Sequence, residues 1–111
     1  MFLALAIAAI CGAARGHQAP SGWEYSPWCC NGAGPHGDCA EVHDVRATAT
    51  GWIVTIAPGT HPKVPAGSPP RQYVIPYGDP AVKKSGDDSY HLCLYPTPDN
   101  VRCFYTPPMG F

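Results

Sequence analysis

The residues with the greatest capacity for chemistry in this sequence are its cysteines and histidines. Cys29, Cys30 and Cys39 lie close together, and His91 stands two residues before Cys93. Thiolate and imidazole groups bind soft metal ions such as Cu(I) and Zn(II). However, the C-C-x8-C spacing differs from the C-x2-4-C hairpin of a zinc finger, and thiols in an oxidising compartment form disulfides first. We therefore favour no metal and no cofactor, and keep a copper or zinc site as the alternative. Its candidate ligands are Cys29, Cys30, Cys39 and His91.

The first 16 residues have the pattern of a secretory signal peptide. Residues 2–10 form an unbroken apolar stretch, far short of the roughly 20 residues that span a bilayer. Small residues follow, and cleavage after Gly16 would make His17 the mature N-terminus. No later segment is apolar enough for a transmembrane anchor. We therefore expect a periplasmic or secreted protein.

Short runs of Val, Ile, Thr and aromatic residues, separated by Pro and Gly, predict a mainly β fold. The expected strands are residues 42–48, 51–57, 71–75, 90–95 and 101–105. The first two and the last two should pair as hairpins, whereas residues 62–70 and 77–89 read as loops. The last hairpin is apolar on both faces. We therefore expect a small antiparallel sheet within a sandwich or partial barrel, or one covered by the N-terminal segment.

The last hairpin also predicts a disulfide. Its strands flank the turn-forming sequence PTPDN, and if Tyr95 faces Val101, then Cys93 faces Cys103. Directly opposed residues are close to disulfide reach after a small adjustment. Closing this eleven-residue loop would stabilise the fold by about 2.7 kcal/mol. We expect a Cys93–Cys103 bridge.

The remaining cysteines leave the framework open. Removal of the signal peptide takes away Cys11 and leaves five cysteines, an odd number. We expect Cys39 to bond to Cys29 or Cys30, because small exported domains rely on disulfides to supplement a small core. The leftover thiol, on Cys29 or Cys30, would be buried or would join two chains in a covalent dimer. The chain has no C-x-x-C, G-x-S-x-G or H-E-x-x-H motif, so we expect no enzymatic activity.

The candidate binding residues are aromatic and lie near the N-terminus. Residues 17–40 lack a helical or strand period, and we expect an irregular segment that cysteines pin to a β domain of residues 41–111. Trp23, Tyr25 and Trp28 fall within six residues of one another there. They either dock the segment on the sheet or form a contact surface, since exposed rings stack on sugars and peptides.

The charge of the chain excludes one class of partner. The mature chain loses Arg15 with the signal peptide, so six of the seven Lys and Arg residues remain, against eight Asp and Glu. No basic stripe is present that could neutralise a row of phosphates. We therefore expect no nucleic-acid partner.

The cysteine motifs also carry a resemblance. They are Trp28-Cys29-Cys30-Asn31, Asp38-Cys39-Ala40, Tyr90-His91-Leu92-Cys93, and Cys103-Phe104-Tyr105 before Pro107-Pro108. This pattern resembles that of small uncharacterised exported proteins of α-proteobacteria over most of the mature chain. The resemblance implies a bacterial periplasmic or secreted setting and no functional residue. Our leading hypothesis is a non-enzymatic, disulfide-stapled module that binds a protein, peptide or glycan.

Overall fold

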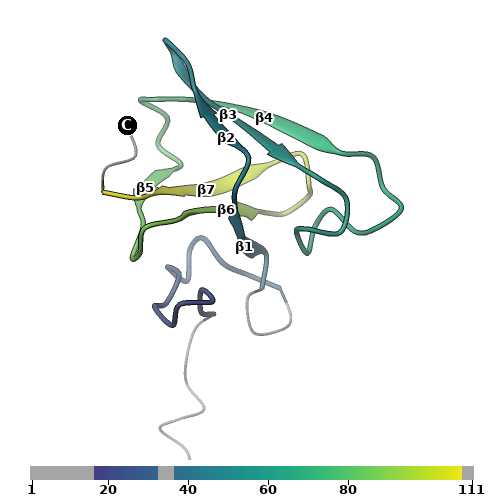
Figure 1. The fold of residues 1–111 in the computed structure, drawn as a ribbon. Helices are drawn as coiled ribbons and strands as arrows, with labels where there is room; N and C mark the ends of the chain where they lie inside the picture. Colours follow the sequence, from purple (N-terminus) through teal and green to yellow (C-terminus); the bar gives the residue numbers. More distant parts are fainter. Residues whose placement is uncertain (1–16, 33–36, 109–111) are drawn as a thin grey trace, which may run out of the picture.

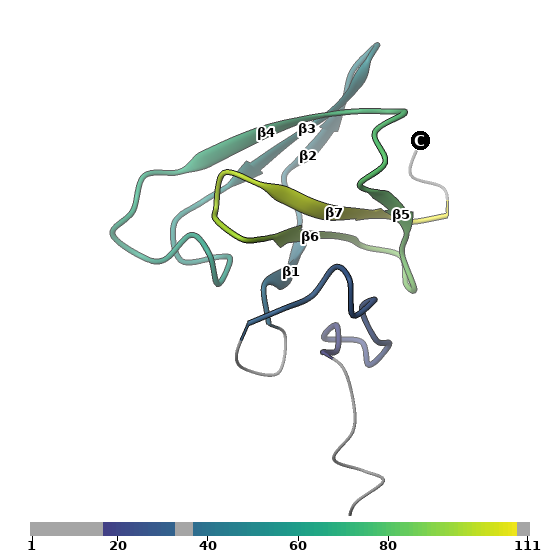
Figure 2. The same cartoon turned by 180° about the vertical axis from the view of Figure 1, so that it is seen from behind.

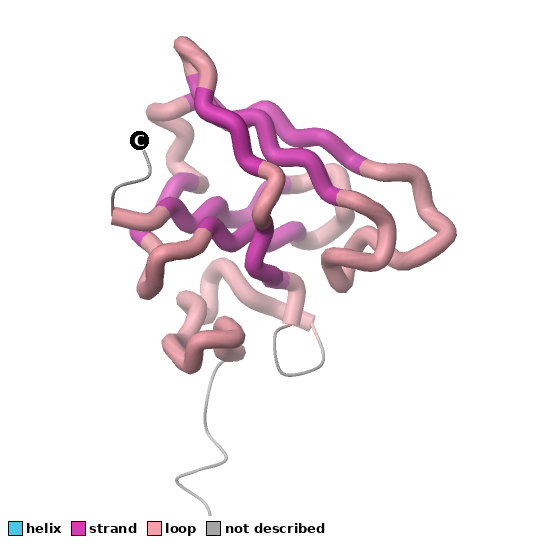
Figure 3. Tube along the Cα trace, in the orientation of Figure 1, coloured by secondary structure: helices cyan, strands magenta, loops and turns pink. Residues whose placement is uncertain are grey.

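The computed structural model describes residues 17–32 and 37–108, and every regular element in those ranges is a β-strand (Figure 3). The strands are β1 (Cys39–Val42), β2 (Val45–Ala47), β3 (Gly51–Ile56), β4 (Arg71–Pro76), β5 (Val82–Lys84), β6 (Tyr90–Leu94) and β7 (Val101–Thr106). The predicted mainly β fold is confirmed. The predicted signal peptide, residues 1–16, lies outside the described residues. Within them there is no helix long and apolar enough to cross a membrane.

The strands form two sheets that pack against each other (Figure 1). The four-stranded sheet has the order β1-β6-β7-β5, and the three-stranded sheet has the order β2-β3-β4. Every pair is antiparallel except β5 with β7. Apolar side chains of both sheets meet in a main core, which consists of Val42, Trp52, Val54, Ile56, Val64, Tyr73, Ile75, Leu92, Leu94 and Phe104.

The hairpins β2–β3 and β6–β7 agree with the sequence-based expectation, but two short strands do not. The sequence predicts one strand over residues 42–48, whereas the chain leaves strand conformation at His43 and Asp44, and its two halves join different sheets as β1 and β2. Residues 77–89, predicted as a loop, contain β5, which pairs with β7. Sheet packing sets such corners and edge strands, and no local pattern records it.

The N-terminal segment, residues 17–32, covers the face of the four-stranded sheet that points away from the main core (Figure 2). It packs there in a second core made of Ala19, Tyr25, Cys29, Cys30, Cys39, Cys93, Cys103 and Tyr105, with Trp23 against it. Side chains of β6 therefore alternate between two apolar environments. Leu92 and Leu94 enter the main core, whereas His91 and Cys93 face the N-terminal segment. This arrangement explains why the last hairpin is apolar on both faces.

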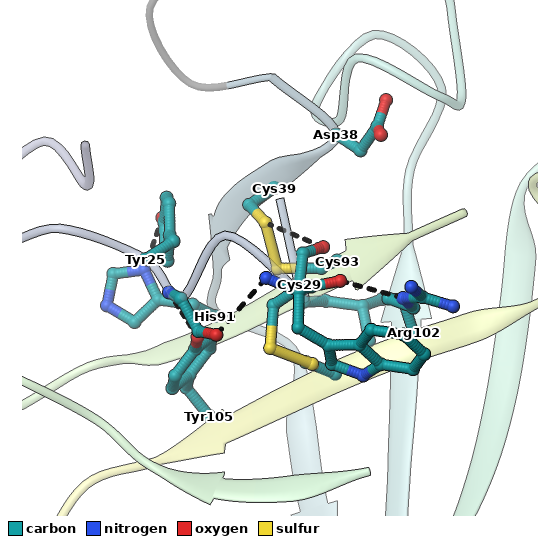
Figure 4. Close-up of a disulfide and its surroundings, with 12 residues drawn as sticks. Tyr25, Cys29, Asp38, Cys39, His91, Cys93, Arg102 and Tyr105 are labelled. Carbon is teal, nitrogen blue, oxygen red and sulfur yellow. Dashed lines mark hydrogen bonds between the residues drawn. A yellow bond between two sulfur atoms is a disulfide. The ribbon is translucent and has the colours of Figure 1, made fainter. Parts of the chain in front are cut away.

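Two disulfides cross-link the second core, and neither is the predicted one (Figure 4). Cys29 bonds to Cys103, and Cys39 bonds to Cys93. The predicted Cys93–Cys103 bridge is wrong, although these residues do lie opposite each other on β6 and β7. Cys93 also faces Cys39 across the pair β1–β6, and Cys103 lies against the N-terminal segment. The prediction failed because the pairing of β1 with β6 was not expected from the sequence. Cys39 thus bonds to neither Cys29 nor Cys30, and Cys30 belongs to neither bridge.

A β-bulge changes the register near the tip of the β6–β7 hairpin. The prediction that Tyr95 faces Val101 is wrong, because Leu94 pairs with Val101 while the cysteines keep their expected register. Arg102 is therefore an extra residue on β7. A bulge redirects side chains relative to a regular ladder. Val101 packs against the main core, and Arg102 turns toward Trp28 of the N-terminal segment.

Candidate functional site

The three candidate binding aromatics lie in different environments. Tyr25 is fully buried in the second core, and Trp23 is partly buried against it. A Cβ atom added at Gly86 would lie only 2.4 Å from the Trp23 ring, so this indole rests directly on the backbone. Trp28, in contrast, has 62% of its surface exposed. Trp23 and Tyr25 dock the segment, and only Trp28 is available as a contact surface.

Trp28 forms a stack with two residues of the last hairpin. The guanidinium carbon of Arg102 lies 3.3 Å from the centroid of the Trp28 ring and 5.4 Å from that of Tyr95. The Nε atom of Arg102 also donates a hydrogen bond of 2.8 Å to the carbonyl oxygen of Trp28 (Figure 4). A cation–π contact at an exposed site contributes about 0.5–1 kcal/mol. We call Trp28, Tyr95 and Arg102 the aromatic platform.

One disulfide positions both main parts of the aromatic platform. Trp28 directly precedes Cys29, and Arg102 directly precedes Cys103, so the bond between the two cysteines brings the indole and the guanidinium together. A turn at Ser26 supports the same region, because the Ser26 carbonyl accepts a hydrogen bond of 2.9 Å from the Cys29 amide. The Cys29–Cys103 disulfide therefore holds Trp28 and Arg102 of the platform next to each other.

A polar site centred on Asp87 lies between the N-terminal segment and the turn before β6. Five groups donate hydrogen bonds to its carboxylate, over distances of 2.6–2.9 Å: Ser21 Oγ, Trp23 Nε1, Ser85 Oγ, the Ser89 amide and His91 Nε2. Burial by itself would raise the pKa of Asp87, but the hydrogen bonds outweigh it and hold the pKa well below the usual range of a carboxyl. Asp87 thus ties the N-terminal segment to the turn before β6 as an ionised group.

The Asp87 site continues into a chain of groups that has the composition of a proton relay. The Nε2 atom of His91 lies 2.8 Å from Asp87 Oδ1, and its Nδ1 atom lies 2.9 Å from the hydroxyl of Tyr25. If Nε2 donates its proton to Asp87, Nδ1 accepts one from Tyr25. Burial raises the pKa of Tyr25 above its ordinary value, and Tyr25 and His91 are only 1% and 0% exposed. Tyr25 and His91 are thus enclosed, and the hydrogen bonds of the chain join the N-terminal segment to β6 and to the turn before it.

Three of the four candidate ligands of the alternative copper or zinc site, Cys29, Cys39 and His91, have other partners in the structure. The sulfur atoms of Cys29 and Cys39 are in disulfides, and both ring nitrogens of His91 are in hydrogen bonds. Among residues 17–32 and 37–108, no group of three or more His, Cys, Asp or Glu side chains is placed to hold a metal ion. The alternative loses two of the three thiolates it needs, because disulfide formation uses them.

Cys30 lies in the second core with 4% of its surface exposed. Burial raises the pKa of its thiol, although hydrogen bonds from the Asp38 and Cys39 backbone act in the opposite direction. The thiolate is the reactive form, and a raised pKa lowers its population. We therefore expect the Cys30 thiol to react slowly with Ellman's reagent at pH 8 in the native protein and faster once urea exposes it. Rapid reaction in the native state, or a disulfide-linked dimer on a non-reducing gel, would contradict this burial.

An open groove of about 340 Å³ lies where the chain passes from β1 to β2. Its polar lining includes Glu41, His43, Asp44 and Thr55. The carboxylate of Glu41 already accepts a hydrogen bond of 2.6 Å from the Ser89 hydroxyl. In the described part of the chain, a few buried side chains have a polar atom without a hydrogen-bond partner, but none of these side chains lines the groove. The groove is therefore a weaker candidate than the aromatic platform.

Sequence reasoning missed two of the three platform residues. Tyr95 and Arg102 belong to no motif, and their roles depend on the bulge and on the pairing of distant cysteines. The available signal is that Trp28 and Arg102 each precede a cysteine, which becomes informative only once the Cys29–Cys103 bridge is known. Comparisons of this chain with protein-family models, with curated proteins and with solved structures find no match. The geometry of the aromatic platform is therefore what points to a function.

Proposed function

We propose that this chain is an exported, disulfide-stapled β module that binds a protein, peptide or glycan in the periplasm or outside the cell. The aromatic platform is its contact surface. Two intrachain disulfides support this setting, since such bonds persist in oxidising compartments. The signal-peptide pattern of residues 1–16 and the resemblance to exported α-proteobacterial proteins support it as well.

The observation that carries this proposal is the exposure of Trp28. Full burial of a large apolar side chain stabilises a protein by about 1.5–3 kcal/mol, and Trp52 is almost completely buried in the main core. Trp28 remains exposed, yet the neighbouring disulfide and the contacts with Arg102 hold it in one place. A rigid exposed aromatic ring loses little conformational entropy on binding, which is why such rings dominate contact surfaces.

The test is the substitution Trp28→Ala in the mature protein. We expect ligand binding on glycan and peptide arrays to fall at least tenfold, because truncating a central aromatic of a contact surface typically costs 2 kcal/mol or more, roughly a factor of 30. The matched control is Val74→Ala. Val74 is 72% exposed on β4 of the other sheet, so its truncation removes exposed apolar surface away from the platform.

Two results would count against the proposed function. If the two variants bind the array ligands equally well, the platform is not the contact surface. If the wild-type protein binds none of the glycans or peptides, the binding role itself is wrong. Thermal melts of both variants serve as the folding control: we expect a midpoint close to that of the wild type for Val74→Ala, and a midpoint lower by a few degrees for Trp28→Ala, which loses the contact with Arg102.

A further inference from the structure

We propose that His61 is a pH-sensitive latch, which holds the loop between β3 and β4 against the four-stranded sheet at neutral pH and releases it in acid. This loop consists of residues 57–70. His61 is one of its buried residues, with 3% of its surface exposed. The latch uses none of the residues of the aromatic platform and is therefore independent of the proposed binding function.

Both ring nitrogens of His61 are used in the folded protein. The Nε2 atom lies 2.8 Å from the carbonyl oxygen of Leu92 on β6, and the Nδ1 atom lies 3.1 Å from the backbone nitrogen of Lys63. A carbonyl only accepts a hydrogen bond and a backbone N–H only donates one, so Nε2 carries the proton and Nδ1 is the acceptor. The neutral ring therefore joins the loop to β6 with one nitrogen and supports the following turn with the other.

Protonation of His61 breaks the second of these bonds. The added proton goes to Nδ1, where it faces the N–H of Lys63, and two donors cannot bond to each other. The same turn contains a hydrogen bond of 2.9 Å from the Val64 amide to the His61 carbonyl and one of 2.8 Å from the Gly59 amide to the Val64 carbonyl. A buried charge without full compensation is costly, so the protonated ring favours an open loop. Residues 59–64 should loosen first.

Two charged groups act on His61 in opposite directions. The carboxylate of Asp38, just before β1, favours the protonated ring, and the ammonium group of Lys63 disfavours it. These two groups form an ion pair of 3.4 Å, so their effects partly cancel. On β6 the side chain of His91 faces the N-terminal segment instead. Burial is the largest effect, and it lowers the pKa of His61 below its ordinary value.

His91 is also buried, but its partners differ in a way that matters for protonation. The Asp87 carboxylate accepts from Nε2, and the Tyr25 hydroxyl next to Nδ1 can accept as well as donate. His91 can therefore take up a proton and keep both contacts. His61 cannot, because its partner at Nδ1 is a backbone N–H. The pH dependence of the loop is thus assigned to His61.

The direction of the pH effect follows from the two states of the loop. An open loop exposes His61 to water and returns its pKa to about 6.5, whereas the closed loop holds the pKa lower. The latch is therefore complete above about pH 6.5 and weakens as the pH falls below that value. Between pH 7.5 and pH 5.0 the ratio of open to closed loop should rise by up to about thirtyfold. Ala57 and Thr60 also line the groove between β1 and β2, so the release changes one wall of this groove.

The experiment measures hydrogen exchange of single amides by NMR in the mature protein at pH 7.5 and pH 5.0, corrected for the intrinsic exchange rate at each pH. We expect the protection of the Gly59 and Val64 amides to fall about tenfold to thirtyfold at pH 5.0, while the Val54 amide on β3 stays more protected than either. His61→Gln offers a donor and an acceptor but does not titrate, so it should remove this fall. The matched control is His43→Gln, an exposed histidine between β1 and β2, which should keep it.

Three results would overturn the latch. They are equal protection of the loop amides at the two pH values, a fall of wild-type size in His61→Gln, and loop amides as well protected as Val54, since the loop would then open only with the whole fold. The interval from pH 7.5 to pH 5.0 lies above the range in which a carboxylate such as Asp87 titrates, so acid sensitivity at Asp87 does not enter. If His61→Gln fails to fold, the wild-type protein at the two pH values, with Val54 as reference, decides alone.

Discussion

Replacing Cys29 and Cys103 together by alanine should lower the free energy of unfolding by about 3.4 kcal/mol. The two residues are 74 positions apart, but the intact Cys39–Cys93 bridge lies inside this loop and shortens it to residues 29–39 and 93–103, and the chain-entropy model assigns this stabilisation to a loop of about 22 residues. The bridge also attaches the N-terminal segment to β7, so its loss should release Trp23 from the second core. Urea unfolding gives the free energy, and accelerated hydrogen exchange of the amides of residues 17–32 reports the release.

The controls for this prediction come from the other cysteines. Cys30→Ala leaves both of these bridges intact and should cost much less. Loss of the Cys39–Cys93 bridge, whose separation is 54 residues, should cost about 3 kcal/mol, because the enclosing Cys29–Cys103 bridge still constrains the unfolded chain. Peptide mapping under non-reducing conditions must find these two pairings. A linked Cys93–Cys103 peptide, or a Cys30→Ala variant as unstable as the double variant, would refute the assignment of the framework.

The second large effect is expected at Asp87. We predict that Asp87→Ala lowers the free energy of unfolding by about 3 kcal/mol, because an unsatisfied buried donor costs about 1–3 kcal/mol. The substitution leaves His91 Nε2 and Trp23 Nε1 without their acceptor. Asp88→Ala is the matched control, since its side chain is exposed and lies at the next position. An effect of equal size at Asp88 would show that the hydrogen bonds of Asp87 contribute little.

The depressed pKa of Asp87 also predicts acid sensitivity. The pKa is about 3.9 in an unfolded chain and lies lower in the folded protein, so the unfolded state takes up the proton first as the pH falls. The stabilisation is complete well above pH 4 and is lost as the pH falls below about 4. Asp87→Asn should flatten this part of the pH profile, whereas Asp88→Asn should keep the wild-type slope. Denaturant unfolding between pH 2 and pH 6 measures both.

Local signals were sufficient for the strands that pair with their sequence neighbours. The runs of β-branched and aromatic residues that became β3, β4, β6 and β7 were predictable, and so was the hairpin around PTPDN. The short β5 was not, because only three residues pair with β7 and they do so in parallel. The Asp87 site could not be predicted either. Two of its hydrogen bonds join residues 64 and 66 positions apart, and a carboxylate in a loop gives no sign of such partners.

The sequence by itself determined that this chain forms a mainly β fold whose last hairpin is apolar on both faces. It also determined which cysteines were available as cross-links and which aromatic residues were candidates for a contact surface. Only the tertiary structure decided how they combine: Cys93 had two opposing cysteines on neighbouring strands, and the bulge directed Arg102 toward Trp28. The physical reason is that strand periodicity acts over a few residues. The bridges and the aromatic platform join residues more than 50 positions apart, which meet only when the layers pack.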